Sequence, residues 1–185
     1  MWLRKSIRVA AVLLTTVFLS QGVHAQTTAP RPPADFSAFL DRVDAAQLEL
    51  QNGRPAQFKA LWSHADDVTL SGGLGGAIEK GWDAVSRRLD WVGTQFSNGV
   101  NRNERVVVNV IGDLGYVIQR ESLKYRVPGQ TTDSTREYRV TMIFRRETGE
   151  WRMIHRQADS LTVKQLPAHA TLRQRSATRP PMTTR

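Results

Sequence analysis

The residues of this chain that first suggest chemistry are four glycines within five positions, in the stretch SGGLGGAIEKGW from Ser71 to Trp82. Glycine-rich loops cradle phosphates in many nucleotide-binding proteins. A Walker loop, however, ends in Gly-Lys-Ser or Gly-Lys-Thr. A dinucleotide loop needs a glycine three residues after Gly75, where this chain has Ile78. We therefore reject a phosphate site and expect the loop either to turn the chain or to line the mouth of a pocket.

Metal and nucleophile chemistry find little support in the sequence. His64, Asp66 and Asp67 lie close together, but a catalytic zinc site usually has three protein ligands, and HADD before a strand is more often a solvated turn. The chain has no cysteine and no Gly-x-Ser-x-Gly motif, and neither His64 nor His155 has a partner that spacing reveals. The sequence predicts no metal and no cofactor.

The formal net charge of +9 suggests a nucleic-acid partner until the charges are located. Of the 26 Lys and Arg residues, three precede Gln26 and five follow Thr162, whereas all 17 acidic residues lie between these ends. The segment that remains carries about one net positive charge, so we predict no nucleic-acid partner.

The two ends of the chain differ in composition from its centre. A basic start, an apolar run over 9–19 and the residues VHA predict a signal peptide over 1–25, although an uncleaved membrane helix stays an alternative. The Pro- and Thr-rich residues 26–34 predict a linker, and the basic residues 163–185 predict a disordered tail. We expect an exported protein, periplasmic or secreted, with no transmembrane segment in the mature chain. Binding of the tail to an anionic surface stays open.

Periodicity along residues 35–162 predicts the elements that must position any site. Helical spacing occurs over 36–50, after Pro55 and over 82–96. A short strand is predicted over 67–71, and long strands over 105–112, 114–127, 136–147 and 151–161, with tight turns at Gly112-Asp113 and Thr148-Gly149. Three helices followed by antiparallel strands indicate an α+β fold.

Alternation along the last three strands separates two faces. One face carries mainly apolar residues: Tyr116, Ile118, Val140, Met142, Phe144, Trp151, Met153 and His155. The other is more polar: Gln119, Glu121, Arg139, Thr141, Ile143, Ile154, Arg156 and Ala158. From the pattern alone, the first face is the core and the second faces solvent.

The ordered set of segments ADDVTLSG, KGWDAV, GDLGYVIQRE and RVTMIFRRETGEWRMIHRQAD resembles the nuclear transport factor 2-like superfamily, and within it the SnoaL-like domain. The resemblance covers residues 35–161. It implies a cone-shaped fold in which three N-terminal helices pack on a strongly curved antiparallel sheet, enclose a pocket and form a homodimer through the sheet. Members include ketosteroid isomerase, polyketide cyclases, dehydratases and the association domain of calmodulin-dependent kinase.

The same resemblance reverses the assignment of the two faces. It implies that Gln119, Glu121, Arg139, Thr141, Ile154, Arg156 and Ala158 face the pocket. The apolar row of Val140, Met142, Trp151 and Met153 would then be covered by a second copy of the chain, since an uncovered apolar sheet is prone to aggregation.

Ketosteroid isomerase activity is not expected. The position of the isomerase's proton-abstracting aspartate corresponds to Gly72, and its oxyanion tyrosine and aspartic acid correspond to Ala46 and Thr141. Glycine and alanine can neither take a proton nor donate a hydrogen bond through a side chain. The glycines would form the lip of the pocket.

Three hypotheses follow. The first is an exported protein that binds a small apolar or acidic molecule through Glu121, Arg139 and Arg156, with Gln119, Thr141 and Ile154 beside them. The second is a cyclase-, dehydratase- or hydrolase-type enzyme with Glu121 as acid and base. The third is a domain that serves only to dimerise, with a vestigial pocket.

Overall fold

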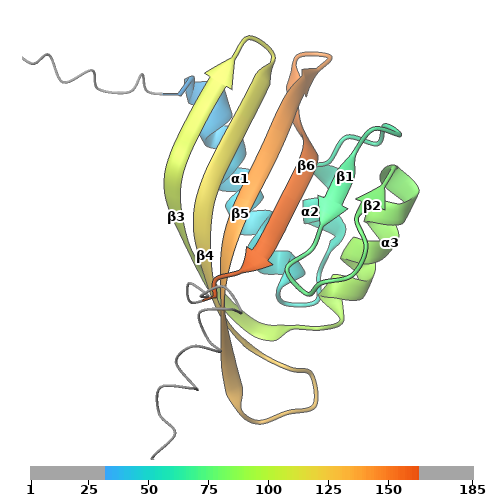
Figure 1. The fold of residues 1–185 in the computed structure, drawn as a ribbon, viewed down its shortest axis with the longest axis vertical. Coiled ribbons are helices and arrows are strands. Elements are labelled where there is room, and N and C mark those ends of the chain that lie inside the picture. Colours follow the sequence, from blue (N-terminus) through green and yellow to red (C-terminus); the bar gives the residue numbers. More distant parts are fainter. Residues whose placement is uncertain (1–31, 163–185) are drawn as a thin grey trace, which may run out of the picture. The chain divides into compact units, whose positions relative to one another are not determined.

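The structure, a computed structural model, describes residues 32–162 (Figure 1). The predicted signal peptide over 1–25, residues 26–31 of the predicted linker and the predicted tail over 163–185 lie outside the described residues. Within 32–162, no helix is long and apolar enough to cross a membrane.

Three helices and six strands confirm the α+β class. The helices are α1 (Ala34–Leu50), α2 (Ala56–Ala60) and α3 (Trp82–Gly93). The strands are β1 (Thr69–Ser71), β2 (Glu79–Lys80), β3 (Ser97–Ile111), β4 (Leu114–Arg126), β5 (Asp133–Glu147) and β6 (Glu150–Ser160). Tight turns join β3 to β4 and β5 to β6 at the predicted positions. In the second turn Thr148 and Gly149 both have positive φ, at 47° and 88°, which the right-handed twist of a hairpin favours.

The sheet is mixed, which corrects the prediction of a purely antiparallel one. Its strand order is β2-β1-β6-β5-β4-β3, and β1 pairs with β6 in parallel, with Thr69 opposite His155. Sequence periodicity cannot reveal this pairing because the two strands are more than 80 residues apart. The predicted strong curvature is also wrong, because the sheet is not strongly curled (Figure 1).

Helix α1 covers the inner face of the sheet through the residues that helical spacing predicted. Phe36, Phe39, Leu40, Val43, Ala46 and Leu50 are all buried. Near the start of α1, Phe36 lies 5.5 Å from Phe144 and 4.8 Å from Trp151, measured between ring centroids. Gly115 lies beneath these rings, and a Cβ there would lie 2.6 Å from the Phe36 ring, so the close packing requires glycine.

Each of the two face assignments made from the sequence is half right. On β5 the buried residues are Tyr138, Val140, Met142 and Phe144, as the pattern alone predicts. On β4 the buried residues include Gln119 and Glu121, as the resemblance predicts. The register explains the difference, because Gln119 lies opposite Val140 and Glu121 opposite Tyr138. The apolar row on β5 and β6 is therefore core, and its predicted role in dimerisation is wrong.

A β-bulge in β6 completes this correction. Met153 pairs with Phe144 and His155 pairs with Ile143, so Ile154 is an extra residue without a partner on β5. The bulge reverses the alternation along β6. As a result Trp151 and Met153 before it, and Arg156 and Ala158 after it, all point to the inner face.

Candidate functional site

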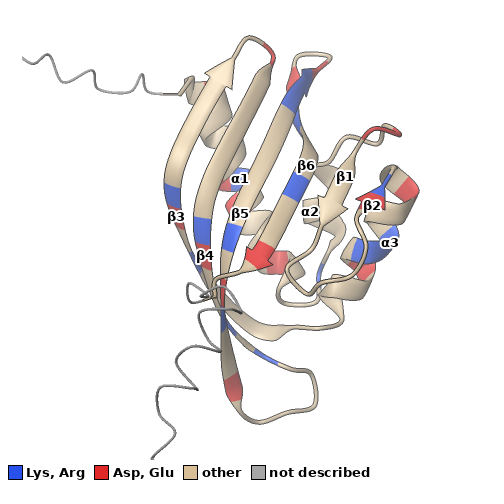
Figure 2. Ribbon diagram, in the orientation of Figure 1, with Lys and Arg blue, Asp and Glu red and all other residues tan. Residues whose placement is uncertain are grey.

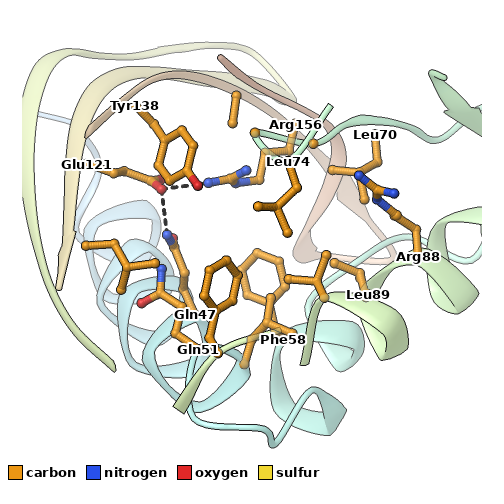
Figure 3. A pocket seen from close by; sticks show the side chains of 17 residues that line it. Gln47, Gln51, Phe58, Leu70, Leu74, Arg88, Leu89, Glu121, Tyr138 and Arg156 are labelled. Atoms are coloured by element: carbon orange, nitrogen blue, oxygen red, sulfur yellow. Dashed lines mark hydrogen bonds and ion pairs between the residues drawn. The ribbon is translucent and has the colours of Figure 1, made fainter. Parts of the chain in front are cut away.

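A cavity of about 70 Å³ lies on the inner face of the sheet, beneath the C-terminal half of α1. Strands β4, β5 and β6 form one side of the cavity, and α2, α3 and the glycine loop contribute to the other (Figure 3). Its lining is mainly apolar, with polar side chains around Glu121 and a separate charged side chain, Arg88. The lining includes Gln47, Gln51, Leu74, Arg88, Glu121, Tyr138, Arg156 and Ala158.

Glu121 is the centre of the polar group. Its side chain is 1% exposed and receives three hydrogen bonds. Gln47 Nε2 and Arg156 Nη2 each donate to Oε2 at 2.7 Å, and Gln119 Nε2 donates to Oε1 at 2.8 Å. Figure 3 shows Gln47 and Arg156 approaching the Glu121 carboxyl group from two sides. Three donors, one of them a guanidinium, bind this group as the carboxylate.

Local structure accounts for this convergence. Gln119 and Glu121 are two residues apart on β4, so alternation places both on the inner face. Arg156 reaches the same face because of the bulge at Ile154. Gln47 comes from α1, four residues after the buried Val43, and so lies on the helix face that covers the sheet.

The polar group is not fully satisfied. Among the described residues, buried atoms without a hydrogen-bond partner include Oε1 of Gln47, Gln51 and Gln119, and Nε of Arg156. Buried polar atoms are paired in the large majority of cases in folded proteins, by protein groups or by ordered water. Unpaired atoms beside a cavity therefore indicate a place where a ligand or water binds.

The glycine loop borders the mouth of the cavity, as the sequence led us to expect. Gly72, Gly73 and Leu74 all line it. A Cβ on Gly73 would lie 2.4 Å from the Tyr138 ring, so the loop can pass over Tyr138 only as glycine. Arg88 Nη2 of α3 donates to the Gly75 carbonyl at 2.5 Å and joins the loop to the helix.

Two of the predicted site residues lie away from the cavity, and a third does not line it. Arg139 points to the outer face, where its side chain is 60% exposed and pairs with Asp159. Thr141 lies opposite Ile118 and Gln157 on that outer face. Ile154 is the bulged residue, which packs partly against the core and does not line the cavity. The structure brings Gln119, Glu121 and Arg156 together, but only Glu121 and Arg156 line the cavity, and Gln119 contacts it through Glu121.

Sequence reasoning missed Gln47, Gln51 and Tyr138. A signal for the glutamines was present, because Gln47 is seven residues after Leu40 and four after Val43, both on the apolar stripe of the predicted helix. Two glutamines one turn apart on such a stripe indicate polar groups directed into the core. Tyr138 could be found only through the register of β5.

The two histidines within residues 32–162, His64 and His155, contact other kinds of group. His64 stacks on Trp82 with ring centroids 4.0 Å apart, and Asp67 instead accepts hydrogen bonds from Arg145. Thr69 Oγ1 lies 2.7 Å from His155 Nδ1, and burial lowers the pKa of the His155 imidazole. Over residues 32–162, no three His, Asp or Glu side chains are grouped as metal ligands would be.

Comparison with solved structures shows the fold. A nuclear transport factor 2-like superfamily protein from Salmonella enterica matches with a TM-score of 0.61 at 13% identity, covering 72% of this chain and 93% of that chain. A provisionally assigned association domain of a calcium/calmodulin-dependent protein kinase type II from Thiobacillus denitrificans matches with a TM-score of 0.57 at 23% identity. The match covers 68% of this chain and 94% of that chain. A ketosteroid isomerase-like protein from Erwinia carotovora matches with a TM-score of 0.54 at 16% identity. The match covers 70% of this chain and 92% of that chain.

Comparison of sequences gives the family. No curated protein matches this sequence. The family model described as the SnoaL-like domain matches residues 40–162, which include most of α1, the glycine loop and the whole polar group around Glu121. The chain therefore belongs to the SnoaL-like domain family.

Proposed function

We propose that this protein binds a small, largely apolar molecule in the cavity beneath α1. The observation that carries the proposal is the buried group of Gln47, Glu121 and Arg156 beside the cavity, with unpaired polar atoms. An apolar lining with a few convergent polar groups is the usual composition of a small-molecule site. A buried ion pair contributes little net stability compared with apolar residues of the same size, so stability alone does not explain this group.

Binding is favoured over acid–base catalysis because Glu121 is already engaged. Both carboxylate oxygens accept hydrogen bonds, and Oε2 accepts two. A general base must have a lone pair within reach of the substrate proton. The position that holds the isomerase base in the resemblance is Gly72, which has no side chain to supply one. We therefore do not propose the enzyme alternative.

The size of the cavity limits what can bind without rearrangement. At about 70 Å³ it is less than half the size of the ~150 Å³ cavity that holds benzene in another protein. A ring-sized ligand must therefore displace the half-buried side chains of the mouth, Leu74 and Arg88.

We further propose that the protein is exported and acts as a homodimer through the outer face of the sheet. Support for the dimer comes from exposed apolar side chains on β3 and β4, namely Val106, Ile111, Leu114 and Ile118. Figure 2 shows no charged residue on these strands from Val106 to Gly112 or from Leu114 to Gln119. An exposed apolar patch of this kind is typical of a protein interface.

A matched pair of variants tests the binding proposal. Ala158→Met places a large side chain in the cavity, whereas Gln157→Met places the same side chain at the exposed neighbouring position of β6. Native chain and both variants are titrated with phenol, anisole and benzoate and followed by two-dimensional NMR. We expect at least one compound to shift resonances of cavity residues in the native chain and in Gln157→Met, and binding to be lost in Ala158→Met. If no compound shifts them, or if Ala158→Met binds as the native chain does, the proposal is wrong.

A further inference from the structure

The unpaired atoms in the cavity wall differ in polarity. Two are acceptors, the Oε1 atoms of Gln47 and Gln51, and one is a donor, Nε of Arg156. Gln47 is 2% exposed and Gln51 6% exposed, so bulk water does not readily satisfy either side chain. Gln47 lies in the last turn of α1 and Gln51, four residues later, is the C-cap residue with helical backbone angles, so both amide groups lie on the same side of the cavity.

Glu121 fixes the orientation of the Gln47 amide. A carboxylate only accepts hydrogen bonds, so the Gln47 group that contacts Oε2 must be its NH₂ group. The atom left over is then the carbonyl oxygen. The same argument holds for Gln119, whose NH₂ group donates to Oε1 of Glu121. Glu121 thus orients two amides so that each leaves an acceptor without a donor.

The charges beside the unpaired acceptors do not select an acid. Glu121 and Arg156 form an ion pair with an N–O distance of 2.7 Å and together carry no net charge. Arg139, which would have added a further positive charge, lies on the outer face. Arg88 keeps its positive charge, because the Gly75 carbonyl that it contacts is neutral, but Figure 3 shows it across the cavity from Glu121. A carboxylate beside the polar group would meet the carbonyl oxygens of the two glutamines and the Glu121 carboxylate as well as Arg156 Nε.

Resting on the proposed function, we infer that the ligand is a neutral molecule that inserts a hydroxyl group into the polar side of the cavity. The hydroxyl donates its hydrogen to the Gln47 or Gln51 carbonyl and accepts a hydrogen bond from Arg156 Nε. This arrangement satisfies an acceptor and the donor with one ligand group, which neither an ether, a ketone nor a carboxylate can do. The apolar body of the ligand lies against the rest of the lining.

Titration with three compounds of one shape tests this inference. Phenol can donate and accept, anisole can only accept, and benzoate carries a negative charge. We expect phenol to bind the native chain with a Kd at least tenfold below those of anisole and benzoate, as measured by NMR titration. Anisole and benzoate would leave the glutamine carbonyl in the complex without a donor, and the free-energy cost of an unpaired buried acceptor accounts for a tenfold difference in Kd.

Two variants assign the preference to the glutamines. Gln51→Met removes one acceptor without touching Glu121, and Gln47→Met removes the other while Gln119 and Arg156 still bind Glu121. Because the hydroxyl has one hydrogen to donate, we expect the preference for phenol over anisole to fall at least threefold in at least one of the two variants. Gln51→Met leaves all three hydrogen bonds to Glu121 in place.

The outcomes separate this inference from the proposed function. Equal Kd values for the three compounds, or tightest binding of benzoate, would overturn the hydroxyl inference while the cavity remained a binding site. An undiminished preference for phenol in both variants would likewise overturn it. If none of the three compounds binds in the cavity, the proposed function fails and the inference fails with it.

Discussion

Helix α1 covers two regions of the inner sheet face that differ in composition. The first, here called the aromatic end, comprises Phe36, Phe39, Phe144 and Trp151. The second, here called the polar end, comprises Gln47, Gln51, Gln119, Glu121 and Arg156. At the aromatic end the ring centroids lie 4.8 to 6.4 Å apart, whereas at the polar end a cavity adjoins unpaired buried atoms.

This difference in composition indicates that the two ends of α1 have different roles. Burial of aromatic rings is among the largest favourable contributions to folding that single side chains make. A buried ion pair with incomplete hydrogen bonding makes no comparable contribution. We infer that the aromatic end holds α1 on the sheet and that the polar end is kept for a ligand.

The largest effect is expected at the aromatic end. Phe144→Ala removes a fully buried ring in contact with Phe36 and Phe39 and should lower the free energy of unfolding by about 3–5 kcal/mol. Ile143→Ala, at the neighbouring half-buried position on the outer face, is the control and should lower it by less than about 1.5 kcal/mol. Urea unfolding measures both. Similar losses in the two variants would contradict the structural role of the aromatic end.

A somewhat smaller loss in the free energy of unfolding is expected when the ion pair of the polar end is broken. Glu121→Met leaves Arg156 without its counterion, and breaking a buried pair typically costs ~3–5 kcal/mol. We expect a value near the lower limit, about 3 kcal/mol, because the Arg156 side chain is still 12% exposed and borders the cavity. Urea unfolding again measures it. A loss below about 1 kcal/mol would show that Glu121 and Arg156 are not paired in solution.

The outer face should affect association and not folding. Ile118→Asp places a charge in the exposed apolar patch, so it should convert the proposed dimer to monomer and change the unfolding free energy of the chain by only about 0.5 kcal/mol. Met142→Asp, by contrast, places a carboxylate in the core and should prevent folding. Light scattering and circular dichroism distinguish these results. A native chain that is monomeric at micromolar concentration would contradict the dimer.

The smallest effect is expected in the titration of Tyr138, beside the polar end. Burial raises the pKa of its phenol above the ordinary value of 10.0, although the nearby Arg136 acts in the opposite direction. The folded chain thus holds this proton more tightly than the unfolded chain, and the associated stability is present below pH 10 and lost as pH rises above it. Absorbance titration at 295 nm should show a phenol that ionises late in the native chain and is absent in Tyr138→Phe. A late phenol that persists in Tyr138→Phe would contradict this.

The sequence predicts the local features of this molecule well. Helical spacing predicts the buried residues of α1, and the dipeptides Gly112-Asp113 and Thr148-Gly149 predict the two hairpin turns. The resemblance placed Gln119, Glu121 and Arg156 on one face. Alternation within β4 is sufficient for Gln119 and Glu121, whereas the inward position of Arg156 depends on the bulge at Ile154, which only the resemblance could anticipate. Gln47 is also predictable, because it is a polar residue at a position on the apolar stripe of α1.

The failures concern the pairing of strands with one another. The orientations of Arg139 and Thr141 depend on the register of β5 against β4, which shifts every side chain to the opposite face when it changes by one residue. The bulge at Ile154 reverses the alternation in the middle of β6. The parallel pairing of β1 joins residues that nothing in the local pattern connects. These relations are fixed by packing of the whole sheet against α1.

One measurement tests the division between the two ends most directly. The combined variant Gln47→Met, Gln119→Met, Glu121→Met, Arg156→Met replaces the paired groups of the polar end with apolar side chains of similar length, and leaves no partner unpaired. Replacement of a buried ionic group in this way is often neutral or stabilising by ~1–4 kcal/mol. We predict by urea unfolding that the combined variant is at least as stable as the native chain, although Glu121→Met alone is not. A loss of several kcal/mol in the combined variant, comparable to that of Phe144→Ala, would show that the polar end also holds the fold together and would contradict the account.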